Sequence, residues 1–157
     1  MEKLTIGIDP GQKGAIAIIQ GQFCIDIKDM PLMPNHEVDA NELYRYLNMP
    51  EHRGYRTAVI ERSQPMPKQG VVSVFSYGRG YGAIVAVLQV LEIPFQEVPA
   101  MKWKKSFSLN RDKGESVTKA LELFPSLKQT VFYTPRGRML DGRAEALLIA
   151  EYGRRHL

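Results

Sequence analysis

The chain has 157 residues, of which 44% are hydrophobic and 24% are charged, a composition that favours one globular domain spanning residues 1–157. The single cysteine, Cys24, excludes an internal disulfide and argues against a structural zinc site, which fits the reducing cytoplasm. The longest uncharged apolar stretch, residues 80–91, is too short to span a bilayer, so we expect no membrane segment.

Charge is distributed unevenly along the chain, although the formal net charge is only +4. Residues 1–61 carry six Lys or Arg and nine Asp or Glu, a net charge of −3. Residues 62–157 carry 15 Lys or Arg and eight Asp or Glu, a net charge of +7. An acidic first part and a basic remainder suit a protein that holds metal ions with one region and a polyanion with the other.

Three short β-strands are predicted within the first thirty residues. Residues 4–8 are rich in β-branched side chains and end at an Asp-Pro-Gly turn sequence. Residues 15–19 and 23–27 follow, separated by Gln-Gly-Gln, a length and composition typical of a hairpin connection. We therefore expect three antiparallel strands, followed by a loop that contains two prolines.

Helices and strands are predicted to alternate from residue 38 onwards. The expected elements are a helix over 38–47, a strand over 56–60, a helix over 71–91, a strand over 95–98, and helices over 100–107, 113–124 and 140–155. A meander of strands followed by alternating helices and strands predicts an α/β fold, in which a mixed five-stranded sheet has helices on both faces.

Four acidic residues occupy positions where a solvated surface is not expected. Asp9 and Glu61 each end a predicted apolar strand, and the two carboxylates meet if these strands are parallel neighbours. Asp141 and Glu145 are four residues apart, and therefore lie on one face of the last predicted helix. Buried acids need a compensating cation because charged groups are almost never buried unpaired.

Carboxylates without His or Cys partners are typical ligands of Mg²⁺ or Mn²⁺. Two such ions about 3.5–4 Å apart activate a water and stabilise the leaving oxygen at a phosphodiester. We therefore predict that Asp9, Glu61, Asp141 and Glu145 bind metal and hydrolyse phosphodiesters without a covalent enzyme intermediate. Taken singly, each acid also has an ordinary interpretation as a turn former, a helix cap or a solvated surface residue.

Six sequence blocks carry a family resemblance. They are Ile-Gly-Ile-Asp-Pro-Gly at residues 6–11, Ala-Val-Ile-Glu at 58–61, the glycine-rich 77–82, 98–105 with Trp-Lys-Lys, 119–125, and Asp-Gly-Arg-Ala-Glu-Ala-Leu-Leu at 141–148. In this order, over nearly the whole chain, they resemble the RuvC family of Holliday junction resolvases. The resemblance implies an RNase H-like fold, a homodimer, and a crossover junction endodeoxyribonuclease that makes paired symmetric nicks in four-way DNA junctions.

One departure concerns the last helix, where the family commonly has two Asp three residues apart. Here the pair is Asp141 and Glu145, four apart, and either acid can be the dominant ligand.

The resemblance also places Lys104 and Lys113 near the scissile phosphate as catalytic residues. Further candidates for DNA contact are Arg62, Gln64, Lys68, Arg79, Lys102 and Lys105. The alternatives are a solvated helix face for the lysines around Trp103, an ordinary loop for residues 62–70, and pairing across a dimer interface for Arg79. We expect Trp103 in the core.

The resulting hypothesis is a cytoplasmic, dimeric endonuclease that uses Mg²⁺, with Mn²⁺ as a substitute, to cleave four-way junctions or other branched DNA in a bacterial or phage-infected cell. The glycine-rich helix around residues 77–88 is the expected dimer surface. One alternative is an RNase H-like nuclease for flaps, forks or RNA–DNA hybrids, and another is an inactive junction-binding scaffold. An ATPase or sugar-kinase fragment, which begins with a similar Gly-Ile-Asp strand, is disfavoured because that fold needs two lobes.

Overall fold

Five β-strands form one mixed sheet in the computed structural model, which describes residues 2–110 and 112–157 and only the backbone of Lys113. The strand order is β3-β2-β1-β4-β5. The strands are β1 (Leu4–Asp9), β2 (Ala15–Gln20), β3 (Phe23–Asp29), β4 (Arg56–Arg62) and β5 (Phe95–Pro99). The first three pair in antiparallel fashion, as predicted, whereas β4 is parallel to both β1 and β5.

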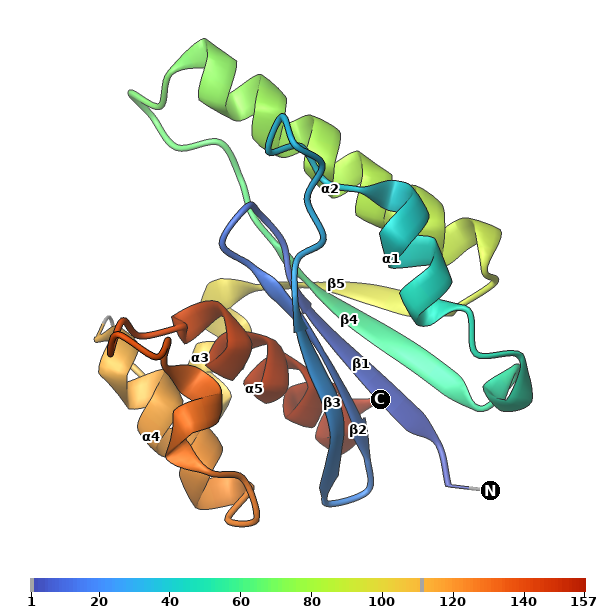
Figure 1. The fold of residues 1–157 in the computed structure, drawn as a ribbon, viewed down its shortest axis with the longest axis vertical. Helices are drawn as coiled ribbons and strands as arrows, with labels where there is room; N and C mark the ends of the chain where they lie inside the picture. The colour runs from blue at the N-terminus through green and yellow to red at the C-terminus, as the bar shows by residue number, and fades with distance from the viewer. Residues whose placement is uncertain (1, 111) are drawn as a thin grey trace.

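Helices cover both faces of this sheet (Figure 1). The α-helices are α1 (Ala40–Leu47), α2 (Val71–Val90), α3 (Ala100–Ser106), α4 (Lys113–Leu123) and α5 (Asp141–His156). Helices α1 and α2 lie on one face, and α3, α4 and α5 lie on the other. Two short 3₁₀ helices, η1 (Pro50–His52) and η2 (Gln129–Phe132), occur where the sequence predicted no element.

The alternation of side chains along β1 decides which helix each residue meets. Ile6 and Ile8 are fully buried in the hydrophobic cluster that includes Leu88 of α2. Gly7, between them, lies against α5 on the opposite face. Because successive strand residues point to opposite faces, Asp9 shares the α5 face with Gly7. The same alternation in β4 turns Glu61 toward α5.

Helix α5 packs directly on the backbone of β1 because Gly7 has no side chain. A Cβ atom at Gly7 would lie 2.1 Å from the carbonyl oxygen of Ala146 and 2.3 Å from the amide nitrogen of Ala150. Further along α5, a Cβ at Gly153 would lie 2.6 Å from Cγ2 of Val59 in β4. Glycines on both elements therefore let the helix approach the sheet more closely than ordinary side chains allow.

Arg143 ties the first turn of α5 to the edge of the sheet. Its Nε and Nη2 atoms donate to the two carboxylate oxygens of Asp29 at 2.7 and 2.9 Å, and Nη1 donates to the carbonyl of Val131 at 2.9 Å. The hydrogen bonds from Arg143 hold the pKa of Asp29 below its ordinary value. This bidentate contact fixes the position of the helix relative to the end of β3.

Helix α2 is attached to the sheet mainly through its C-terminal half. Leu88 is fully buried, and the buried guanidinium of Arg56 donates to the carbonyl of Leu91, just after the helix, at 3.1 Å. The N-terminal half extends beyond the sheet, where Val71 and Val72 are 85% and 83% exposed (Figure 1). The helix therefore projects past the strand ends that carry Asp9 and Glu61.

Substituting Gly7→Ala should destabilise the fold by about 1–3 kcal/mol, because the added methyl group must push α5 away from β1. Urea unfolding followed by circular dichroism measures this loss. Gly70→Ala is the matched control, since Gly70 has φ −61° and a Cβ there meets no atom within 4 Å. Equal stability of the two variants would contradict the close contact between α5 and β1.

Candidate active site

The ends of two parallel strands bring Asp9 and Glu61 together. Strands β1 and β4 are neighbours, and Ile8 is in register with Ile60. The next residue on each strand is an acid, and both acids project toward the α5 face. The sequence-based expectation that the two carboxylates meet at one edge of the sheet is therefore confirmed.

The first turns of α5 supply a third carboxylate. One carboxylate oxygen from each of Asp9, Glu61 and Glu145 lies within 4.8 Å of the other two, and we call these residues the acidic trio. Asp141 begins α5, and its charge acts on both Asp9 and Glu145, although it is not part of the trio. Glu145 is therefore the acid of the last helix that groups with the two strand-end carboxylates.

The acidic trio is electrostatically strained. Burial raises the pKa of Asp9 well above its ordinary value, and the charges of Glu145, Glu61 and Asp141 raise it further. Burial also raises the pKa of Glu61 and of Glu145, and the ammonium group of Lys104 offsets part of each increase. Clustered oxygen ligands that repel one another in a partly buried site fit a hard divalent cation such as Mg²⁺.

Trp103 holds one member of the trio in place. Its indole is fully buried, as the sequence predicted, and its Nε1–H donates to Oε2 of Glu61 at 2.7 Å. The contact arises because Glu61 is in register with Val98 of β5, so α3 begins directly beside the acid. Sequence reasoning missed this role, although a buried indole N–H generally needs an acceptor.

Only one of the three lysines on α3 turns toward the trio. Lys104 Nζ lies 3.6 Å from Oε1 of Glu145 and 5.4 Å from the ring centroid of Trp103. Lys102 and Lys105 are exposed on the outer side of the helix. The side chain of Lys113 lies outside the described residues, so its predicted place near the phosphate stays a prediction.

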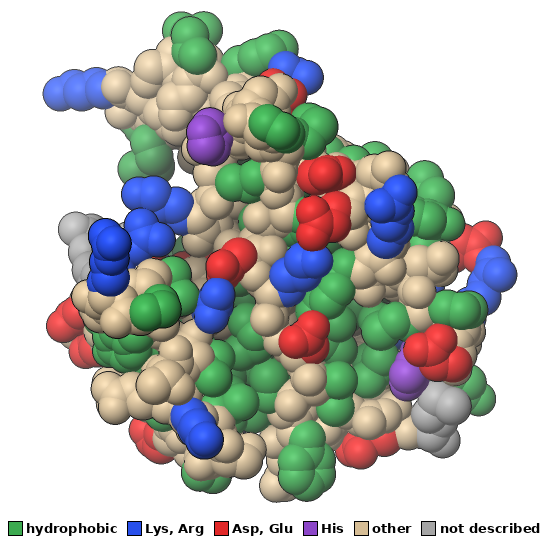
Figure 2. All heavy atoms as spheres, in the orientation of Figure 1, with side chains coloured by type: hydrophobic (Ala, Val, Ile, Leu, Met, Phe, Trp, Pro, Cys, Tyr) green, Lys and Arg blue, Asp and Glu red, His purple; other side chains and the backbone are tan. Residues whose placement is uncertain are grey.

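None of the remaining predicted DNA-contacting residues belongs to the trio. Arg62, Gln64 and Lys68 are exposed in or beside the segment that joins β4 to α2. Arg79 of α2 forms an ion pair with Glu37 of the same chain at 2.6 Å, a partner that the sequence analysis did not anticipate. Contact of these four residues with DNA stays a prediction. Lys and Arg side chains do gather beside the hollow below the projecting end of α2 (Figure 2).

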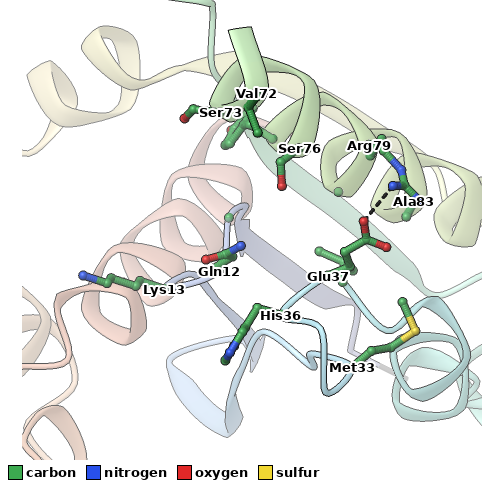
Figure 3. Close-up of a pocket in the computed structure, with 14 residues that line it drawn as sticks. Gln12, Lys13, Met33, His36, Glu37, Val72, Ser73, Ser76, Arg79 and Ala83 are labelled. Carbon is green, nitrogen blue, oxygen red and sulfur yellow. Dashed lines mark hydrogen bonds and ion pairs between the residues drawn. The ribbon is translucent and has the colours of Figure 1, made fainter. Parts of the chain in front are cut away.

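A cavity of about 580 Å³ lies beyond the strand ends, on the α2 side (Figure 3). It is bounded by α2, by the β1–β2 turn at residues 11–13, and by residues 33–38, and we call it the α2 groove. Tyr77 lines the groove, and burial and then the charges of Glu61 and Asp9 raise its pKa. The nearby Ser63 side chain offsets part of the increase in the pKa of Tyr77. The two side chains do not meet the distance and angle limits of a hydrogen bond.

Neutralising one acid should stabilise the metal-free protein. A carboxyl group with a raised pKa destabilises the fold once it is ionised, so Asp9→Asn should raise the free energy of unfolding at pH 7 by about 1–2 kcal/mol in EDTA. Added Mg²⁺ should then raise the melting temperature of the wild type more than that of the variant.

The matched control is Glu122→Gln, which removes an exposed acid in α4 and should leave the stability nearly unchanged with or without Mg²⁺. Differential scanning calorimetry provides all of these values. A lower stability of Asp9→Asn in EDTA would show that the trio is not under electrostatic strain.

Comparison with known proteins shows where this fold occurs. No family model matches the sequence, and no curated protein matches it. A solved structure of RuvC from Thermus thermophilus in complex with Holliday junction substrate is 19% identical, with a TM-score of 0.63, and the match covers 98% of this chain and 96% of that one. A second Thermus thermophilus RuvC structure is 20% identical at the same TM-score, covering 97% and 96%. The predicted RNase H-like α/β class is therefore confirmed, and the chain has the fold of the RuvC structures.

Proposed function

We propose that this protein is a metal-dependent endonuclease that resolves four-way DNA junctions by paired symmetric nicks, in DNA recombination and repair. The observation that carries the proposal is the convergence of Asp9, Glu61 and Glu145 from three elements far apart in the sequence. The shared fold with a RuvC structure described as a complex with Holliday junction substrate supports branched DNA as the substrate. A cytoplasmic location agrees with this role.

The acidic trio would hold Mg²⁺, or Mn²⁺ in its place, with Asp141 as a further ligand from the start of α5. The donor set fits because it consists of carboxylate oxygens within 4.8 Å of one another. When bound, the metal supplies activation of a water and neutralisation of charge at the phosphodiester.

The protein's own groups position the reacting atoms and balance charge. Trp103 orients the Glu61 carboxylate through the 2.7 Å hydrogen bond from its indole. Lys104 stands beside Glu145 and offers positive charge to the scissile phosphate as negative charge develops there. We assign the same role to Lys113 at the start of α4. Strand binding falls to the exposed set of Arg62, Gln64, Lys68, Arg79, Lys102 and Lys105.

A synthetic four-way junction should be nicked by the wild type with Mg²⁺ and left intact in EDTA. Asp9→Asn, Glu61→Gln and Glu145→Gln should each lower kcat roughly 100- to 1,000-fold, because each removes charge at the proposed metal site. Labelled junctions resolved on denaturing gels give the rates and the symmetry of the nicks. Glu122→Gln on the exposed face of α4 serves as the active control.

Each alternative function has its own outcome in the same assay. Faster cleavage of forks, flaps or RNA–DNA hybrids at equal concentration would assign another substrate to the same site. Junction binding without cleavage in Mg²⁺ or Mn²⁺ would instead identify a binding scaffold. Full cleavage activity of Asp9→Asn would contradict the proposal that the acidic trio is the nuclease active site.

A homodimer is the second part of the proposal, because two symmetric nicks require two active sites related by a twofold axis. The outer face of α2 is the surface that we assign to it. Val71 and Phe75 are 85% and 67% exposed there, and a Cβ at Gly78 or Gly82 would meet no atom within 4 Å. A glycine inside a helix lowers the stability of the helix by about 1 kcal/mol relative to alanine. Close approach of a second helix would explain why two glycines lie on this exposed face. The proposed contact face does not reach the end of the predicted range of residues 77–88, because Leu88 is fully buried against the sheet.

Helix α2 is also long and apolar enough to cross a bilayer, with a mean hydropathy of 1.4 over its most apolar 18 residues. This is weak evidence for a membrane segment, because its buried residues Ile84, Val87 and Leu88 belong to the sheet's hydrophobic core. We therefore propose that a second copy of the chain covers the exposed face.

Phe75→Glu should convert a dimer into a monomer, because it places a charge in the centre of the proposed apolar contact. Sedimentation equilibrium measures the mass. Thr118→Glu, on the exposed side of α4, is the control and should leave the dimer intact. A dimer that survives Phe75→Glu, or a wild type that floats with phosphatidylglycerol vesicles, would contradict this surface.

A further inference from the structure

A short hairpin turn precedes α5, and hydrogen bonds hold it in one conformation. We call residues 134–138 the arginine turn. The backbone N–H of Thr134 donates to the carbonyl of Arg138 at 2.8 Å, and the Thr134 hydroxyl oxygen accepts from the backbone N–H of Arg138 at 3.0 Å. Gly137 has φ +85°, the left-handed conformation that closes a three-residue hairpin loop.

The residues next to the arginine turn anchor it to the rest of the fold. Tyr133 and Met139 form an antiparallel bridge, and both pack against the hydrophobic cluster that includes α5. The backbone N–H of Leu140 donates to the carbonyl of Phe132 at 2.7 Å. The turn is therefore preorganised, so a ligand that binds there loses little free energy to ordering the chain.

Two arginines project from this preorganised turn. Arg136 and Arg138 are exposed, and neither side chain forms a hydrogen bond or ion pair with another residue that the structure describes. By contrast, five other arginines pair with carboxylates, namely Arg53, Arg79, Arg143, Arg154 and Arg155. Guanidinium groups without an acid suit phosphate, because their fork of N–H donors matches two phosphate oxygens.

The arginine turn lies beside the end of β3. Arg143 binds both carboxylate oxygens of Asp29, the last residue of this strand. The hydrogen bonds from Arg143, and then the charges of Arg143 and Arg138, lower the pKa of Asp29. The charge of Arg138 thus reaches Asp29, while Arg143 occupies both oxygens of the carboxylate and leaves the Arg138 side chain to other anions.

Strand register relates the end of β3 to the acidic trio. Asp29 pairs with Ala15, which pairs with Asp9 on its other side. Paired residues point to the same face of a sheet, so Asp29 and Asp9 both face α5. Because neighbouring strands are about 4.8 Å apart, Asp29 lies about 10 Å from Asp9.

Cations therefore flank the trio from both edges of the sheet. Lys104 comes from α3, which follows the edge strand β5, and the arginine turn stands at the opposite edge, beside β3. A DNA strand with one phosphate at the trio can extend across the strand ends toward β3. Phosphates of one strand follow each other about every 3.4 Å along a duplex, so 10 Å corresponds to about three nucleotides.

We propose that Arg136 and Arg138 bind backbone phosphates of the cleaved strand, about two to four nucleotides from the scissile phosphate on one side. This inference rests on the proposed nuclease function and adds a contact that holds the strand across the ends of β1, β2 and β3. Phosphate contacts carry no direct sequence information, so the arginine turn strengthens binding whatever the sequence.

The salt dependence of DNA binding tests this contact. Fluorescence anisotropy gives the affinity for a labelled four-way junction in EDTA at several KCl concentrations. Each lost phosphate contact lowers the slope of log K against log salt by about 0.9 in magnitude. Arg136→Gln/Arg138→Gln should therefore lower the slope by about 1.8 and weaken binding roughly 10- to 100-fold. Arg136→Lys/Arg138→Lys should keep the slope, because lysine retains the charge.

The matched control is Lys3→Gln/Arg45→Gln, which removes the same charge from two other exposed residues. Lys3 precedes β1 at the end opposite Asp9, and Arg45 lies in α1 on the other face of the sheet. This control should keep the slope and affinity of the wild type. Thermal unfolding followed by circular dichroism should give all variants nearly the same Tm, since every replaced side chain is exposed.

A second measurement locates the contact along the DNA. Junctions carry one uncharged methylphosphonate at successive positions on both sides of the nick. The wild type should lose affinity at positions about two to four nucleotides from the nick on one side, and Arg136→Gln/Arg138→Gln should lose nothing further there. With Mg²⁺, the same variant should raise KM and leave kcat unchanged, because neither arginine touches the reacting atoms.

The outcomes separate the two proposals. If the wild type binds the junction and nicks none of its strands, the nuclease function fails, whereas the salt slope still tests the arginine turn. If nicking occurs and Arg136→Gln/Arg138→Gln keeps the wild-type slope, the phosphate contact is overturned and the nuclease function stands. An equal loss of slope in Lys3→Gln/Arg45→Gln, or additive losses at every methylphosphonate position, would also overturn the contact.

Discussion

The contact between α5 and the backbone of β1 is the constraint on which the acidic site depends. Gly7 leaves no room for even a methyl group, so the helix lies against the strand itself. This spacing places Glu145 within 4.8 Å of Asp9 and Glu61. Larger residues on either element would separate the acids and leave them as ordinary surface carboxylates. The packing of α5 on the backbone of β1 thus sets the distances among the three acids.

The rest of the site limits the repulsion that this packing creates. Burial raises the pKa of all three acids, repulsion by neighbouring carboxylates raises the pKa of Asp9 and Glu145 further, and Lys104 counters part of these increases. Trp103 fixes Glu61 by hydrogen bonding rather than by charge. Such an arrangement is unfavourable for folding and favourable for binding a divalent cation, which is the usual relation between stability and function at an active site.

Much of the fold was predictable because local periodicity and turn residues identify strands and helices independently. The pairing of Asp9 with Glu61 was predictable on the condition that the two apolar strands which they end are parallel neighbours, and the structure meets this condition. The contact of Trp103 with Glu61 and the ion pair of Arg79 with Glu37 were not. They depend on side-chain positions between elements distant in sequence, which no local pattern encodes. The position of Glu145 beside the two strand-end acids likewise needed the packed helix.

The uneven attachment of α2 has a consequence for motion. Its C-terminal half is held by buried contacts and by Arg56, whereas its first turns carry exposed residues such as Val71 and Val72. Opening of the N-terminal turns therefore requires less free energy than opening of the sheet, and their amide hydrogens exchange with solvent sooner. One wall of the groove is formed by the N-terminal turns of α2, whereas Asp9 and Glu61 lie on strands of the sheet. Movement of this end of α2 changes the width of the groove without displacing Asp9 or Glu61, which lie on β1 and β4.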